Sequence, residues 1–142
     1  MARPLALPLA LLLSAPAALS AQAQQEAPPP VLSISSYVCP QSTLAEIREN
    51  YEKYTIPVER EMVQEGQLLG AGIYFHAWSD EWNFNYYRVA SGIDALMAAV
   101  AEVGRRVNEA NPELANQPGP FAACTAHKDN IYFMGPTTGN GG

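Results

Sequence analysis

The hydrophobic periodicity of residues 31–134 alternates between strand-like and helical segments, and this alternation constrains the fold more than any other feature of the sequence. Runs rich in β-branched and aromatic residues predict strands, whereas apolar residues spaced three or four apart predict amphipathic helices. We therefore predict an α+β domain with a ferredoxin-like β-α-β-β-α-β antiparallel sheet and two helices on one face. The predicted segments span residues 31–39, 44–66, 68–78, 82–90, 91–111 and 121–134.

Local signals mark the ends of the two predicted helices. Thr43 with Glu46 three residues later forms a capping-box pattern that predicts the start of the first helix, and Gly66 predicts its end. Pro57 lies inside this helix and has no backbone N–H, so the helix should kink or break there. Ser91 is the expected cap of the second helix, which should end before Pro112.

The last predicted strand has two possible forms. Residues 121–126 and 131–134 are both extended in character, and the segment His127–Asn130 between them has the composition of a turn. The region is therefore either one long strand interrupted at this segment or a final hairpin.

The first 23 residues have the order of a cleavable secretory signal peptide. Arg3 precedes an apolar run at residues 4–13, and small residues follow at 14–23. The apolar run is shorter than the roughly 20 residues that a membrane-spanning helix needs, and no later segment approaches that length. We expect cleavage after Ala23 or Ser20, export to the periplasm or the extracellular space, and no transmembrane segment in the mature chain.

Removal of the signal peptide would leave a small acidic domain. Residues 24–30 are predicted as a Pro-rich spacer, 31–134 as the folded domain and 135–142 as a flexible Gly-rich tail. The formal net charge of −6 becomes −7 when Arg3 is lost. A strongly acidic domain does not suit phosphate contacts, so nucleic acid is not an expected partner.

The layout resembles the dimeric α+β barrel superfamily over nearly all of the mature chain. The resemblance rests on the first strand, the long helix with its break at residues 54–57, Glu65-Gly66, the strand pair ending in residues 84–87, and the second helix. It implies a homodimer whose two sheets pack face to face. Large apolar side chains on both alternating sets of the second and third strands support the same expectation, because a sheet with one wet face alternates with polar residues.

The two cysteines are expected to form a disulfide. In a ferredoxin-like sheet the first and last strands are antiparallel neighbours, which places Cys39 near Cys124. An exported chain would oxidise such a pair. The alternative is two independent buried thiols.

Aromatic side chains alternate along the second and third strands and suggest a ligand-binding pocket. If one alternating set faces away from the helices, toward a dimer partner, it would line a pocket with aromatic walls. His76 could act there as an acid or base, and Arg88 could hold an anion. Otherwise the aromatics form the dimer-interface core and His76 is inert. The candidate ligand-binding residues are Tyr74, His76, Trp78, Trp82, Tyr86 and Arg88, with Phe84 in the same set.

The sequence contains no HExxH, CxxC, GxSxG or glycine-rich phosphate loop, which removes support for conventional hydrolases and nucleotide enzymes. His127 lies in the turn-like segment and is expected to have a surface role, and nothing in the spacing of His76 and His127 calls for a metal site. No cofactor is predicted. The favoured hypothesis is a binding or structural protein. The alternative is a small-molecule enzyme, a cofactor-independent oxygenase-like or isomerase-like protein, with His76 as its catalytic candidate.

Overall fold

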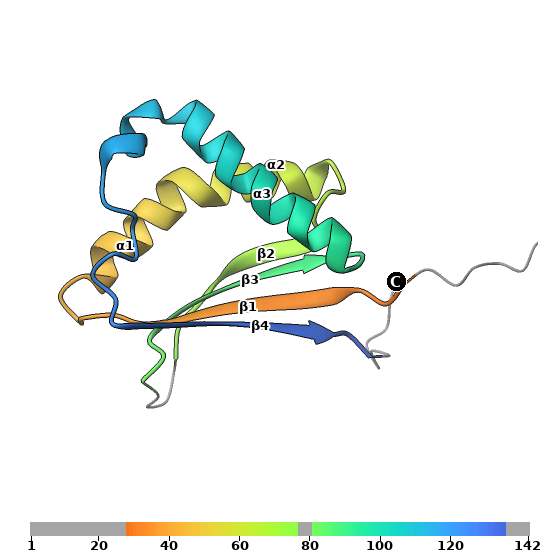
Figure 1. Cartoon of the computed structure of the whole chain (residues 1–142), viewed down its shortest axis with the longest axis horizontal. Coiled ribbons are helices and arrows are strands. Elements are labelled where there is room, and N and C mark those ends of the chain that lie inside the picture. The colour runs from red at the N-terminus through yellow and green to blue at the C-terminus, as the bar shows by residue number, and fades with distance from the viewer. Residues whose placement is uncertain (1–27, 77–80, 136–142) are drawn as a thin grey trace, which may run out of the picture.

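The described part of the chain is a four-stranded antiparallel sheet with its helices on one face (Figure 1). The computed structural model describes residues 28–76 and 81–135, so the predicted signal peptide, most of the spacer, most of the tail and Trp78 lie outside it. The strand order is β2-β3-β1-β4, which confirms the ferredoxin-like prediction. The elements are β1 (Val31–Val38), α1 (Leu44–Asn50), the π-helical segment η1 (Tyr51–Thr55), α2 (Ile56–Gln64), β2 (Gly70–Tyr74), β3 (Phe84–Ala90), α3 (Ile93–Ala110), the 3₁₀ segment η2 (Pro112–Asn116) and β4 (Ala126–Phe133).

The first helix contains a π-helical turn just before Pro57 but does not end there. Because Pro57 has no N–H, the carbonyl four residues earlier, that of Lys53, lacks its α-helical donor. The helix accommodates this with a π-helical turn over Tyr51–Thr55, in which the N–H of Ile56 donates to the carbonyl of Tyr51. Segments α1, η1 and α2 follow one another without a gap, so the predicted break takes the form of a single wide turn.

Both predicted side-chain caps are wrong. Thr43 occupies the N-cap of α1, but its hydroxyl donates to the carbonyl of Pro40 at 2.9 Å and makes no cap bond to the helix. For α3 the N-cap is Gly92, with Ser91 one residue outside the helix. Competing local hydrogen bonds of this kind are common for short hydroxyl side chains. The C-terminal limit of α3 at Ala110, before Pro112, agrees with the prediction.

Gly66 ends the first helix as predicted. Its φ of 75° lies in the left-handed region, and the N–H of Gln67 donates to the carbonyl of Met62 at 2.9 Å. We expect Gly66→Ala to destabilise the protein by about 1 kcal/mol in urea unfolding, because a Cβ disfavours this conformation. No atom lies within 4 Å of the added Cβ, so steric overlap would not contribute.

Gly104→Ala is the matched control for this substitution. Gly104 lies within α3 and also has open space around an added Cβ. Alanine there should stabilise the protein by roughly 0.5–1 kcal/mol, because it has the higher helix propensity. A neutral or stabilising Gly66→Ala would contradict the role given to the left-handed residue.

The hydrophobic core lies between the helices and the sheet, in two clusters. One cluster packs α2 and α3 on Val31 and Ala90, with Met62, Leu68 and Leu96 almost completely buried. The other lies at the opposite end of the sheet and contains Cys39, Ile47, Tyr51 and Phe84. Successive side chains of a strand point to opposite faces of the sheet. The strand residues that belong to these clusters therefore show which side chains of each strand face the helices.

Strand β4 is continuous, so the predicted turn at His127–Asn130 is wrong. Residues 126–133 all pair with β1, including Tyr37 with His127 and Ile34 with Asn130. Pairing with a neighbouring strand overrides the turn-like composition. At the start of this strand Cys39 and Cys124 form the predicted disulfide. Within residues 28–76 and 81–135, no helix has the length and apolar character needed to cross a bilayer.

Candidate functional site

The predicted aromatic set is divided between the two faces of the sheet. In the β2–β3 hairpin Tyr74 lies opposite Asn85, and Ile73 lies opposite Tyr86. Even-numbered residues of β2 therefore share a face with odd-numbered residues of β3. Tyr74 points away from the helices, whereas Tyr86 and Arg88 point toward them. The grouping made from the sequence is wrong, because hairpin register depends on a turn that composition did not define.

The other predicted residues lie near the far end of this hairpin. His76 is exposed and lies two residues beyond the end of β2. Trp82 is half-buried, and the ammonium of Lys128 lies 4.0 Å from its ring centroid. Asn85 donates through Nδ2 to the carbonyl of Trp82 at 3.0 Å. Lys128 and Asn85 both lie across from Ser36 on the side away from the helices, so Trp82 packs against that side.

We call the sheet surface that points away from the helices the open face. Tyr87 crosses β2 there, since a Cβ added at Gly72 would lie 3.1 Å from its ring, and Tyr74 packs beside it with ring centroids 6.5 Å apart. No described helix covers this face (Figure 1). Each of the four strands contributes large apolar side chains to this face, although β2 contributes only one because its other two positions there are glycines. These side chains are Leu32, Ile34, Val38, Tyr74, Tyr87, Val89 and Tyr132.

On the helix-facing side the structure brings together a buried acid, phenol and guanidinium that the sequence reasoning missed. Glu59 is only 2% exposed. Its Oε1 accepts a hydrogen bond from the Tyr51 hydroxyl and another from Nε of Arg88, each at 2.8 Å. Glu59 falls on the buried stripe of α2 beside Val58 and Met62. A carboxylate on an apolar helix face is the sequence signal that could have identified this cluster.

Burial and charge together set the protonation of the groups in this cluster. Burial raises the pKa of Glu59, and the attraction of Arg88 and the hydrogen bond from Tyr51 partly offset that rise. Burial and the neighbouring carboxylate raise the pKa of the Tyr51 phenol, which therefore stays protonated and donates. The Arg88 guanidinium also lies 4.8 Å from the ring centroid of Tyr86. Oε2 of Glu59 has no hydrogen-bond partner among the described residues.

His127 takes part in a second, exposed cluster on β4. Its ring stacks on Tyr37 at 4.4 Å, and its Nε2 lies 3.0 Å from Oδ1 of Asp129. The same oxygen accepts a hydrogen bond from the Ser35 hydroxyl at 2.5 Å. The Ser35 hydroxyl thus donates to the carboxylate that the imidazole also contacts, whereas a nucleophile would donate to the imidazole as its base. Among the described residues, no three His, Cys, Asp or Glu side chains are grouped to hold a metal ion.

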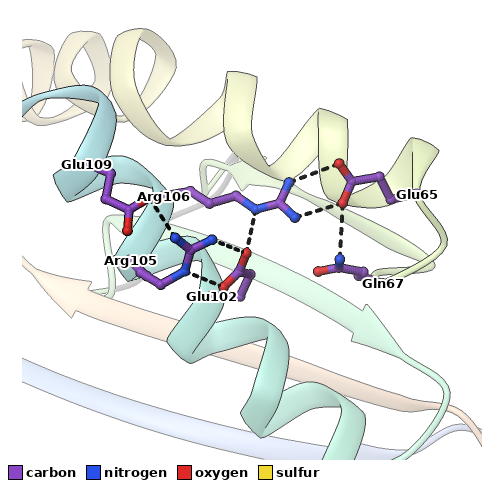
Figure 2. Close-up of polar contacts among 6 residues, drawn as sticks. All are labelled: Glu65, Gln67, Glu102, Arg105, Arg106 and Glu109. Atoms are coloured by element: carbon purple, nitrogen blue, oxygen red, sulfur yellow. Dashed lines mark hydrogen bonds and ion pairs between the residues drawn. The ribbon is translucent and has the colours of Figure 1, made fainter.

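An ion network on the outer surface joins the end of α2 to α3 (Figure 2). Arg106 donates to both carboxylate oxygens of Glu65, at 3.0 and 2.8 Å, and to Glu102 at 2.7 Å. Arg105 bridges Glu102 and Glu109. Hydrogen bonds from the two arginines lower the pKa of Glu102 to about 2. Because every charge is paired in a solvent-exposed setting, we assign this network to the packing of the helices.

Comparisons with known proteins support the fold alone. Neither a protein-family model nor a curated protein matches the sequence. Among solved structures, a NIPSNAP family protein from Agrobacterium tumefaciens is similar at 12% identity and a TM-score of 0.55, covering 78% of this chain and 89% of that chain. A dimeric ferredoxin-like protein from an uncultured marine organism has 6% identity and a TM-score of 0.55, covering 78% and 90%. A cofactor-independent oxygenase from Streptomyces nogalater has 12% identity and a TM-score of 0.49, covering 77% and 96%. These likenesses show a ferredoxin-like α+β fold, as predicted from the sequence.

Proposed function

We propose that this chain is an exported homodimeric binding domain in which two copies pack their open faces together. The observation that carries the proposal is the apolar open face itself, where aromatic and branched side chains are not covered by any described helix. Contiguous apolar surface on this scale is typical of protein interfaces. Tyr74 and Tyr132 on this face are 37% and 49% exposed, and the other apolar residues of the face are half-buried, so a partner could bury all of them further.

Two further observations support the proposal. The similar marine ferredoxin-like protein is described as dimeric. The disulfide between Cys39 and Cys124 suits an oxidising compartment, which is where the N-terminal signal-peptide pattern would deliver the chain.

The competing enzyme hypothesis loses its pocket in this geometry. It required His76 and Arg88 to act from one aromatic-lined cavity, as acid or base and as anion anchor. Arg88 is instead buried under α2 against Glu59, while His76 is exposed beyond the end of β2. An oxygenase-like or isomerase-like activity that depends on His76 remains a prediction, and loss of turnover in His76→Ala would be its signature.

The dimer is tested by placing one charge on the open face. We expect Ile34→Glu, on the central strand β1, to raise the dimer dissociation constant at least about 100-fold, because a carboxylate would be buried without a partner. Size-exclusion chromatography with light scattering on the mature protein would show the change from dimer to monomer.

Ile131→Glu is the matched control for this test. Ile131 lies on β4, on the opposite face of the same sheet, and is 47% exposed. The charge there should remain solvated, and the dimer should persist. A wild-type protein that is monomeric at micromolar concentration, or equal dissociation by both variants, would overturn the proposal.

A further inference from the structure

A cavity lies at the end of the helical layer, away from the open face. It has a volume of about 200 Å³ and is formed where the π-helical segment η1, the last turn of α3, η2 and the following loop meet. Tyr51 belongs both to its wall and to the buried cluster with Glu59. A cavity on the order of 150 Å³ can hold one benzene molecule, so this volume suits a single ring with a small substituent.

The π-helical turn is the local reason for the cavity's position. Tyr51, Tyr54 and Thr55 come from this turn and form one wall. The opposite wall comes from Val107, near the end of α3, and from Leu114 in η2. Single π-helical turns inside α-helices are frequent at functional sites.

The cavity lining contains no charged side chain, although the chain is strongly acidic. The polar side chains of its lining residues are the amides of Asn50, Asn108 and Gln117 and the hydroxyls of Thr55 and Tyr54, while the Tyr51 hydroxyl is already bonded to Glu59. Within the described part of the chain, those three amides make no side-chain hydrogen bond. An amide offers both donors and acceptors, so its complement is a group that also donates and accepts.

The apolar part of the lining consists of planar rings. Pro118 and Pro120 form the loop side of the cavity, and the tyrosine rings form the helix side. Planar surfaces of this kind pack well against an aromatic ring. A charged ligand would lose its hydration there without gaining a counterion.

We propose that this cavity binds a small, uncharged aromatic molecule carrying a carboxamide or a similar donor–acceptor group. This inference rests on the proposed binding function and names its ligand class and its site.

Benzamide is the probe for this site, and benzoate and benzamidine are its charged counterparts. In a backbone-amide NMR titration of the mature protein, benzamide should give saturable shifts at residues 50–55 and at Gln117 and Gly119, with a dissociation constant on the order of 1 mM. Both charged compounds should bind at least about tenfold more weakly. Absence of shifts in these segments, or equal binding of benzoate, would overturn the inference.

Two variants that obstruct the cavity make the test specific. Val107→Phe should fill the interior and Gln117→Trp should obstruct the exposed mouth, and each should abolish the benzamide shifts. Val100→Phe is the control, because Val100 lies on the same helix but outside the cavity. Wild-type binding by both obstructing variants would overturn the site.

The oligomeric state of the same samples separates the two proposals. Benzamide binding by a monomer would leave the cavity assignment standing and contradict the dimer. A dimer that fails to bind benzamide would support the dimer proposal and contradict the cavity assignment.

Discussion

Arg88→Met is expected to lower the free energy of unfolding by about 3–5 kcal/mol at pH 7, the range found when one partner of a buried ion pair is removed. The substitution leaves the Glu59 carboxylate almost fully buried and without its guanidinium. Urea unfolding of the mature, disulfide-bonded protein would measure the loss. Arg105→Met is the surface control, since Arg105 is half exposed and its carboxylate partners remain solvated, and it should have a far smaller effect.

The pH dependence distinguishes an electrostatic loss from a simple loss of packing. Burial already raises the pKa of Glu59, and removal of Arg88 takes away the charge that opposes this rise. For a carboxyl whose pKa is higher in the folded than in the unfolded state, the stability contribution is present below the unfolded pKa and lost as pH rises through the folded pKa. The deficit of Arg88→Met should therefore shrink as pH falls from 7 toward about 4.5.

Neutralising Glu59 in the same chain should recover much of the stability. In the double variant Glu59→Gln/Arg88→Met no buried charge is left unpaired, and the amide oxygen of Gln can still accept from Tyr51. We expect at least half of the single-variant loss to be restored. A double variant as unstable as Arg88→Met, with no pH dependence in either, would show that the guanidinium contributes packing alone.

The order of the helices and strands could be predicted from the sequence, because the spacing of apolar residues differs between helices and strands and each segment showed one of the two spacings. The cap of the first helix could not be predicted, because the Thr43 hydroxyl can bond either to the helix or to the preceding turn, and it donates to the carbonyl of Pro40. The continuity of β4 was missed for another reason. Its segment His127–Asn130 is polar, and only the pairing with β1 makes it a strand.

The candidate site depended on hairpin register, which the sequence does not specify here. A shift by one residue moves every side chain of a strand to the other face. Tyr86 and Arg88 therefore joined the helix-facing interior and Tyr74 joined the open face. Glu59 was missed because the helix was identified from its apolar residues alone, although the spacing of Glu59 from Met62 places it on the buried stripe.

Loss of the disulfide is the second large expected effect. The bond between Cys39 and Cys124 joins residues 85 apart in the sequence. In the chain-entropy model a loop of this size stabilises the folded state by about 4–5 kcal/mol, because the cross-link restricts the unfolded chain. We expect Cys39→Ala/Cys124→Ala to lose roughly that amount in urea unfolding, together with a larger m-value that reflects a less compact unfolded state.

Comparing reduction of the disulfide with replacement of its cysteines separates the chain-entropy effect from the loss of packing. Cys39 is buried in the second core cluster beside Tyr51 and Phe84, so its replacement also removes core contacts, whereas reduction of the wild-type protein keeps both sulfur atoms in place. If chain entropy dominates, the reduced wild type and the double alanine variant should be destabilised about equally, and dithiothreitol should not affect the variant. A reduced protein that keeps nearly all of its stability, beside an unstable double variant, would assign the effect to packing around Cys39 instead.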